Sequence, residues 1–322
     1  MTSSLFTIAY YCKIERRISL ANKKVGLNKN TRRLVIQENV AAYLFLLPFL
    51  VFFVGFVLYP MCMCVYTSFF DATMGDREDI FLGLGNYIEL FNDPVFWKAL
   101  WNTMIIVVVS VPVTCIFSLW VASAISKMPV AATSAFRCIF YLPVVTGSVA
   151  VTMVWKWMYN NYYGIFNYVG TSTGLLEKNV NWLGDPKYAL GCIILILLTT
   201  SVGQPIVLYV SALDNVDKSL VEAAEVDGAT PKQAFWKVKW PQMMPTTLYI
   251  LVITTINSFQ CFALIQLLTS GGPSNSTMTI MYYIYHNAFK LYRYGYGNAM
   301  GVILAIIIAI LSAIQFKLGE EK

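Results

Sequence analysis

Two sets of uncharged polar side chains interrupt the most apolar parts of this sequence, and their chemistry is hydrogen bonding. The first set recurs at the helical spacing i, i+3, i+4, i+7: Thr254, Asn257, Ser258 and Cys261. The second set lies in another apolar run: Thr200, Ser201 and Gln204. Hydroxyl and amide groups both donate and accept hydrogen bonds, as the hydroxyls of an uncharged solute require. The two stripes predict the lining of a passage, with hydrogen bonding between packed helices as the alternative.

The chain offers no grouping of residues for bond-making catalysis. His286 is its single histidine and lies among tyrosines, so no Ser/His/Asp or Cys/His arrangement is available. The seven cysteines are scattered without a C-x-x-C pair, which argues against a zinc site or a disulfide framework. Gly271-Gly272-Pro273 lacks the Gly-Lys-Ser/Thr that cradles phosphates. We therefore expect no catalysis, no metal and no bound cofactor in this chain.

The composition indicates a membrane protein. Of 322 residues, 57% are hydrophobic and 12% are charged, whereas soluble domains carry about a quarter charged residues. The net charge of +6 is no signal for nucleic acid, because the basic residues stand where a membrane topology needs them. The bilayer is the partner that the composition predicts.

Six apolar runs are each long enough to cross a bilayer, which takes roughly 20 residues as a helix. They span residues 41–66, 100–125, 135–158, 188–213, 245–268 and 299–316. Several contain proline, which a helix in a bundle tolerates where neighbours satisfy the freed carbonyls. The sequence therefore predicts an all-α polytopic membrane protein with six transmembrane helices.

The basic residues set the expected orientation. With the N-terminus inside, the inner connections and tails hold 16 Lys and Arg residues and the outer ones hold 7. Because basic residues favour the cytoplasmic side, both termini are expected in the cytoplasm, and residues 217–241 with them. The longer connections 67–99, 160–187 and 269–298 are then outside, where they offer surface for a soluble partner.

Residues 217–241 form the most polar internal segment, and they predict two short helices joined by a glycine. Asp217 is placed to cap the first helix, and Gly228 to end it in the left-handed conformation. Residues 230–233 form a capping box with proline at the first helical position. Pro241 is expected to close the second helix, because proline cannot continue it without losing a backbone bond.

The residue order in this segment resembles the EAA signature of the membrane subunits of type I ATP-binding-cassette importers. In that signature Gly follows Glu-Ala-Ala after three residues, and an aliphatic residue, a bulky apolar residue and Pro follow later. The matching positions are Glu222, Ala223, Ala224, Gly228, Val238, Trp240 and Pro241. Trp240 stands where the family normally has Leu. The two alanines leave a side-chain-poor face on which another protein can sit closely.

Four other segments resemble the carbohydrate branch of this family, the maltose and multiple-sugar type. They are Leu46-Leu47-Pro48, residues 96–103, residues 181–186 and residues 267–273. The resemblance implies a type I importer permease (MetI-like) fold in which the two polar stripes contact a sugar or oligosaccharide. It also implies contact with an ATPase through the loop: Glu222, Ala223, Ala224, Asp227, Gly228 and Pro241.

The resemblance further implies the rest of the assembly. The partners are a second homologous permease, two ATP-binding-cassette ATPase subunits that bind ATP and Mg, and an extracytoplasmic solute-binding protein. The location is a bacterial inner membrane. The expected domains are a basic cytoplasmic tail, a first helix with its outer loop, a permease domain containing a coupling loop, and a cytoplasmic C-terminal tail: 1–40, 41–96, 97–316, 214–244 and 317–322.

Three alternatives remain beside this interpretation. A stand-alone carrier driven by an ion gradient would need an ionisable residue in mid-span, and none of the six runs has an acid near its centre. A membrane enzyme acting on lipid-linked sugars would need paired carboxylates, and the outer acidic cluster of Asp76, Glu78 and Asp79 is better explained as a solvated loop. Within the importer interpretation, a polyol, uronate or glycerol phosphate substrate stays open.

Overall fold

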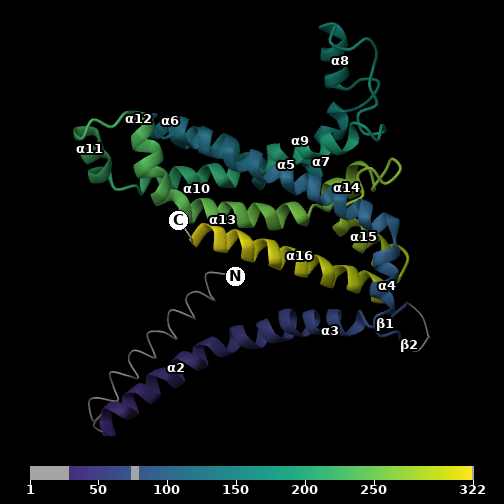
Figure 1. The fold of residues 1–322 in the computed structure, drawn as a ribbon, viewed down its shortest axis with the longest axis horizontal. Helices are drawn as coiled ribbons and strands as arrows, with labels where there is room; N and C mark the ends of the chain where they lie inside the picture. The colour runs from purple at the N-terminus through teal and green to yellow at the C-terminus, as the bar shows by residue number, and fades with distance from the viewer. Residues whose placement is uncertain (1–28, 74–79, 321–322) are drawn as a thin grey trace. The chain divides into compact units, whose positions relative to one another are not determined.

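The described chain is mostly helical and contains one short hairpin (Figure 1). The computed structural model describes residues 29–73 and 80–320. The hairpin pairs β1 (Phe70–Asp71) with β2 (Ile80–Phe81) in antiparallel fashion. Residues 1–28 of the predicted basic tail, and the acidic cluster at residues 76–79, lie outside the described residues. The contacts divide the chain into two units, Met1–Met63 and Cys64–Lys322.

The first unit carries one long apolar helix. It contains α2 (Lys29–Phe53), the π-helical turn η1 (Val54–Leu58) and the start of α3 (Tyr59–Thr67). Asn39–Thr67 is long and apolar enough to cross a membrane, and no residue in its most apolar window is buried. A helix that is apolar on every side needs lipid or another protein around it.

The second unit contains the remaining helices. They are α4 (Gly85–Asn92), α5 (Pro94–Ile125), α6 (Val130–Val145), α7 (Ser148–Met158), α8 (Ile165–Ser172), α9 (Ala189–Ser201), α10 (Gly203–Asp214), α11 (Lys218–Val226), α12 (Pro231–Ala234), η2 (Phe235–Lys239), α13 (Trp240–Phe259), α14 (Ala263–Leu268), α15 (Ile280–Tyr285), η3 (His286–Lys290) and α16 (Tyr294–Glu320). The longer connections of this unit lie between α8 and α9 and between α14 and α15. Figure 1 shows α11 and α12 at one end of this bundle and α4, α8 and α15 at the other.

The predicted spans are present, but two of them are broken. Among the described residues, four helices can each cross a membrane alone, and two bent pairs bring the number to six. The pair α6 and α7 bends by 93°, and the pair α9 and α10 by 41°. Thr146 and Gly147 have extended backbone angles between α6 and α7. The all-α class is confirmed, and the six predicted spans are consistent with the structure when each bent pair is counted as one span.

The bundle packs around α5. Helices α10 and α13 lie against α5, α16 lies against α13, and α6 lies against α10. One apolar core joins α5, α10 and α13 through residues that include Ile206, Tyr209 and Ile250. A second joins α5, α13 and α16 through Phe259 and Met300 among others. These contacts fix the faces of α10 and α13 relative to each other.

A buried asparagine organises residues 160–187 at the end of the bundle that carries α8. The Asn167 side chain is 1% exposed. Its amide nitrogen donates to the Val180 carbonyl at 2.9 Å, and its amide oxygen accepts from Trp182 Nε1 at 2.9 Å. Because a buried amide is costly unless it is hydrogen-bonded, these bonds hold the segment in one conformation.

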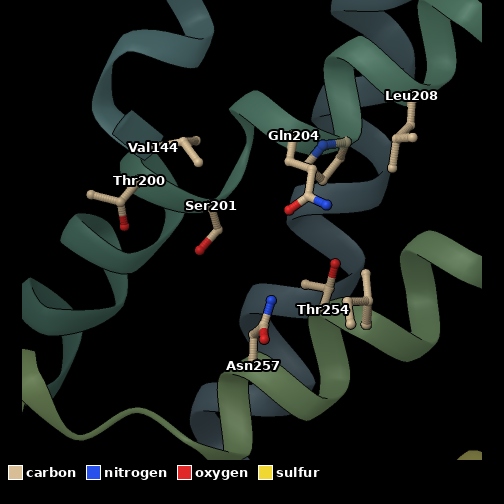
Figure 2. Close-up of a pocket in the computed structure, with 9 residues that line it drawn as sticks. Val144, Thr200, Ser201, Gln204, Leu208, Thr254 and Asn257 are labelled. Atoms are coloured by element: carbon tan, nitrogen blue, oxygen red, sulfur yellow. The ribbon is translucent and has the colours of Figure 1, made fainter. Parts of the chain in front are cut away.

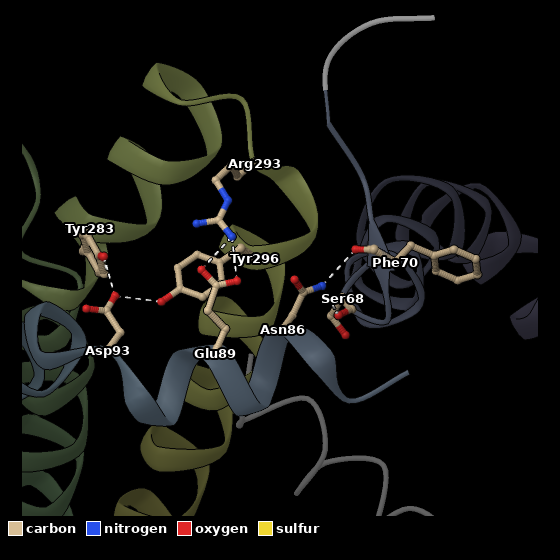
Figure 3. A network of polar contacts seen from close by, with 8 residues as sticks. All are labelled: Ser68, Phe70, Asn86, Glu89, Asp93, Tyr283, Arg293 and Tyr296. Carbon is tan, nitrogen blue, oxygen red and sulfur yellow. Dashed lines mark hydrogen bonds and ion pairs between the residues drawn. The ribbon is translucent and has the colours of Figure 1, made fainter. Parts of the chain in front are cut away.

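Asp93 ties the start of α5 to the C-terminal helices (Figure 3). Its carboxylate caps α5 by accepting from the Val95 N–H at 2.8 Å. The Tyr283 and Tyr296 hydroxyls donate to the same carboxylate at 2.5 and 2.8 Å. Burial raises the pKa of Asp93, but the hydrogen bonds from Tyr283, Tyr296 and the backbone lower it more, so the net pKa lies below its ordinary value.

Replacing Asp93 by asparagine should lower the free energy of unfolding at neutral pH by about 1.5–3 kcal/mol, the usual contribution of a hydrogen bond to a charged group. A depressed carboxyl pKa stabilises the fold above the unfolded pKa of about 3.9, and that contribution is lost as the pH falls through the folded pKa. The difference between the two proteins should therefore shrink below about pH 4. Thermal unfolding of the purified unaltered protein and of Asp93→Asn, at neutral pH and below about pH 4, measures this difference in stability.

Glu89 provides the matched control for this substitution. Its carboxylate pairs with Arg293 at 2.7 Å, in a more exposed position on the same network (Figure 3). Exposed ion pairs contribute about 0–1 kcal/mol, so Glu89→Gln should change stability less. An equal loss in both variants would show that Asp93 contributes only as another surface charge.

Candidate functional site

Helix α11 is capped at both ends. The Asp217 carboxylate caps its start, accepting from the Ser219 N–H at 2.9 Å. Gly228 ends it with φ of +79°, and the Ala229 N–H donates to the Ala224 carbonyl at 2.9 Å. This 6→1 bond around a left-handed glycine is the Schellman arrangement. The predicted caps at Asp217 and Gly228 are confirmed.

The capping box that follows is also present. Thr230 accepts from the Gln233 N–H, and Gln233 Oε1 accepts from the Thr230 N–H at 2.8 Å. Pro231 occupies the first turn of α12. The local sequence therefore determines the helix start as predicted.

The predicted helix end at Pro241 is wrong. The chain stays helical from α12 through η2 to the end of α13 at Phe259, and Pro241 lies in the first turn of α13. The turn before it, η2, is π-helical, and the Trp240 N–H donates to the Phe235 carbonyl. Such a bulge inserts a residue and shifts the hydrogen-bond register. Proline is tolerated in a first turn, where its missing N–H is not needed.

Helix α11 has no buried residue. Glu222, Ala223, Asp227 and Gly228 are exposed and Ala224 is partly exposed. Val226 is 87% exposed, although it is apolar. A nine-residue helix with no buried residue, and with Val221 as its contact to the core of α5, α10 and α13, depends strongly on its caps. The helix therefore presents most of its surface to whatever lies beyond this end of the bundle.

A depression of about 1060 Å³ lies beside α11. Its walls come from the α5–α6 connection, the end of α10, α11 and the α12–η2 segment. Charged groups of both signs line it: Lys127, Asp214, Lys218, Glu222, Glu225, Lys232 and Lys239. Of the predicted coupling residues, Glu222 lines the depression, whereas the other five do not. The mixture of charges suits a protein surface more than a small ion.

A second, smaller cavity of about 150 Å³ lies between α6, α9, α10 and α13 (Figure 2). Five of the seven residues on the predicted polar stripes line it: Thr200, Ser201, Gln204, Thr254 and Asn257. Val144, Pro205, Leu208 and Ile253 complete the lining. The structure thus brings together residues that are more than fifty positions apart in the sequence.

The polar groups of the cavity are available for a ligand. In the part of the chain that the structure describes, the side chains of Ser201, Gln204 and Asn257 make no hydrogen bond to other protein groups, while Thr200 bonds back to the carbonyls of its own helix. Gln204 and Asn257 are exposed. Figure 2 shows both side chains directed into the space between α10 and α13.

The break between α9 and α10 makes room for this cavity. Pro205 has no N–H for the Ser201 carbonyl, so the helical ladder is interrupted there. A Cβ at Gly203 would collide with the Phe140 carbonyl oxygen, so glycine alone allows α10 to approach α6 this closely. The two residues together bend the span at the level of the polar groups.

Ser258 and Cys261 do not line the cavity, which corrects the prediction of one continuous stripe. Ser258 Oγ lies 2.9 Å from Ser110 Oγ and joins α13 to α5. For Ser258 the structure therefore shows the alternative interpretation, a hydrogen bond between packed helices. Cys261 is 6% exposed and belongs to an apolar core. Helix α13 ends at Phe259, so helical spacing no longer applies to position 261.

The apolar lining was not predicted from the sequence. Val144 follows Pro143 on α6, and Leu208 stands one turn after Gln204 on α10. Apolar residues inside spans carry no signal that separates a cavity wall from lipid contact.

Within the described residues no group of three or more His, Cys, Asp or Glu side chains is arranged to hold a metal ion.

Comparison with known proteins identifies the relatives of this chain. The profile of the family described as binding-protein-dependent transport system inner membrane component matches residues 80–319. The probable ABC transporter permease protein YurN of Bacillus subtilis (strain 168) is 33% identical over 90% of this chain and 100% of its own length. The lactose transport system permease protein LacF of Rhizobium radiobacter is 31% identical over 88% of this chain and 95% of its own.

The fold has a solved counterpart. A crystal structure of a bacterial ABC transporter involved in the import of the acidic polysaccharide alginate matches with a TM-score of 0.77. The match covers 90% of this chain and 99% of that chain, at 23% sequence identity. This likeness establishes the arrangement of the helices.

Proposed function

Because the chain belongs to the family of inner membrane components of binding-protein-dependent transport systems, we propose that it forms half of a translocation path for a sugar or oligosaccharide. As a permease subunit it is a transport component rather than an enzyme. The observation that carries the proposal is the cavity at the broken span, where unpaired amide and hydroxyl groups face one space. Such groups match sugar hydroxyls in both donor and acceptor roles.

The cavity lining contains no charged side chain, which favours a neutral substrate. The relative named for lactose transport points the same way. The counterpart named for alginate import leaves a uronate as a possible substrate. A polyol or glycerol phosphate also remains a possible substrate, and one relative is named for sn-glycerol-3-phosphate transport. A strongly anionic substrate would require Arg or Lys in the path.

A stand-alone carrier is a weaker candidate. A carrier driven by an ion gradient needs an ionisable group inside the membrane, and the cavity lining offers none. The energy would then come from two ATPase subunits, which bind ATP and Mg. A second permease would supply the other half of the path, and a solute-binding protein would deliver the substrate.

The orientation of this proposal follows the distribution of charge. Placing α11 in the cytoplasm also places most Lys and Arg residues there, as the positive-inside rule requires. Both termini are then cytoplasmic. The ATPase would dock on α11 and the adjacent depression, with Glu222 pairing with one of its basic residues. Movement of α11 on ATP binding would shift α10 and the cavity.

The direct test is reconstitution. The tagged chain is co-expressed with a candidate ATPase and second permease, a candidate solute-binding protein is added, and uptake into vesicles is measured with labelled lactose, glycerol 3-phosphate and an alginate oligosaccharide. ATP-dependent uptake of the neutral sugar with ATPase capture supports the proposal. Uptake by this chain alone under an ion gradient contradicts the proposed function. If the anionic compounds are taken up and lactose is not, the substrate is anionic and the proposal of a neutral sugar is wrong.

A further inference from the structure

An ion pair joins α6 to α10 where the bundle meets α11, and the proposed function leaves it unexplained. Arg137 Nη2 lies 2.8 Å from Asp214 Oδ2. Asp214 also lines the depression beside α11. Within the described residues, the other ion pair, between Glu89 and Arg293, lies at the opposite end of the bundle.

The pair joins the two helices near the end of the bundle that carries α11. Arg137 is the single charged residue of α6, and its side chain is 31% exposed. Asp214 is the last residue of α10, where the negative end of the helix dipole disfavours a carboxylate. The guanidinium of Arg137 offsets this unfavourable position of Asp214.

The same two helices meet at a second point, beside the cavity. Gly203 at the start of α10 packs directly against the Phe140 carbonyl of α6. Helix α6 contributes Val144 to the cavity wall, and α10 contributes Gln204 and Leu208 (Figure 2). The pair of helices is therefore fastened both at the cavity and at the α11 end.

The link from α10 to α11 is short and anchored. Asn215, Val216 and Asp217 alone separate Asp214 from the start of α11. Val216 is 7% exposed and lies in the core that joins α5, α10 and α13. A connection of this length, with a buried residue in it, passes a displacement of α11 to the end of α10.

We propose that Arg137 and Asp214 are positioning residues that make α6 and α10 move as one body with α11. This inference rests on the proposed function, in which an ATPase displaces α11. With the pair intact, both the α6 wall and the α10 wall of the cavity follow that displacement. Without the pair, α6 and α10 stay joined at Gly203 but not at the α11 end, so the α6 wall follows the displacement less closely and ATP hydrolysis continues with a smaller rearrangement of the cavity.

The test follows the cavity itself and needs no identified substrate. Ser201→Cys is introduced into a chain whose native cysteines are replaced by alanine, within the assembled transporter. Its rate of reaction with a maleimide is compared without nucleotide and with ATP plus vanadate. We expect nucleotide to change the rate about tenfold with the pair intact and less than about twofold in Arg137→Glu or Asp214→Arg, the scale on which mutations in coupled networks act.

Reversing both charges supplies the control. Arg137→Asp combined with Asp214→Arg should restore the nucleotide response, because the pair is re-formed with opposite polarity. ATPase capture and ATP hydrolysis should persist in Arg137→Glu, because Arg137 does not line the depression on which the ATPase is proposed to dock. Since a part-exposed ion pair contributes little to folding stability, the single variants should accumulate in the membrane. If a single variant does not accumulate in the membrane, Asp214→Asn is a milder substitution that also removes the ion pair.

Each outcome decides between the two proposals. A full nucleotide response in the single variants overturns this inference and leaves the proposed function intact. A double variant that stays unresponsive also overturns it, because the defect then does not come from the pair. Failure of the unaltered chain to capture an ATPase removes the proposed function and this inference together.

Discussion

Uptake should fall about a hundredfold in the Glu222→Arg variant, while the protein still inserts into the membrane. Glu222 is exposed on α11 and lines the depression, so its reversal places a positive charge against the basic residue that we propose on the ATPase. Like charges at an interface cost several kcal/mol, and about 2.7 kcal/mol corresponds to the hundredfold loss. The fold should survive, because α11 has no buried residue.

Gly228→Pro should have the same effect for a backbone reason. Gly228 has φ of +79° and donates its N–H to the Glu225 carbonyl at 3.0 Å. Proline is locked near φ −65° and has no N–H, so the end of α11 must change direction. Uptake and ATP hydrolysis in reconstituted vesicles measure both variants, and continued hydrolysis without uptake is the expected signature.

Matched controls exist at the other end of the molecule. Glu177 is an exposed glutamate, and Gly174 is an exposed glycine with φ of +72°. Glu177→Arg and Gly174→Pro repeat the two substitutions near α8 and should leave ATPase capture unchanged. Normal uptake by Glu222→Arg and Gly228→Pro together would refute the coupling role of α11.

Removing the amide groups of the cavity should weaken substrate recognition without lowering ATP hydrolysis by the proposed ATPase. Gln204→Leu and Asn257→Leu should each reduce uptake about tenfold, since a lost hydrogen bond costs about 0.5–1.5 kcal/mol and a desolvated partner on the substrate adds to this. The substitutions keep similar side-chain size. The double variant should approach the product of the two effects unless both amides bind one hydroxyl.

Ser258→Ala is the control for these two substitutions. Its hydroxyl lies on the same helix as Asn257 but bonds to Ser110 outside the cavity. We expect its uptake to keep the original substrate preference, measured across a panel of neutral sugars. If Ser258→Ala changes that preference and Asn257→Leu does not, the wall of the path lies on the other face of α13.

Local structure near α11 was predictable because neighbouring residues determine it. Asp217, Gly228 and the Thr230–Gln233 pair satisfy backbone groups within a few positions of themselves, so sequence patterns report them directly. Pro241 shows where this reasoning fails. Its effect depends on the π-helical turn of Phe235–Lys239, and nothing in the residues before a proline announces such a register shift.

The polar stripes were predictable only in part, because a stripe records spacing and not what faces it. Thr254 and Asn257 face the cavity, whereas Ser258 faces α5, and that difference depends on where the neighbouring helices lie. The sharp bend after Val145 likewise depends on packing. The Arg137–Asp214 pair joins positions 77 apart. A single sequence, read by itself, does not show which residues at such a separation are in contact.

Because α11 has no buried residue and none of its residues lines the cavity, the proposed function implies that the residues contacting the ATPase can change without disturbing those contacting the substrate. Under that proposal, one ATPase could serve several permeases that carry different solutes, provided that each keeps the same small exposed helix.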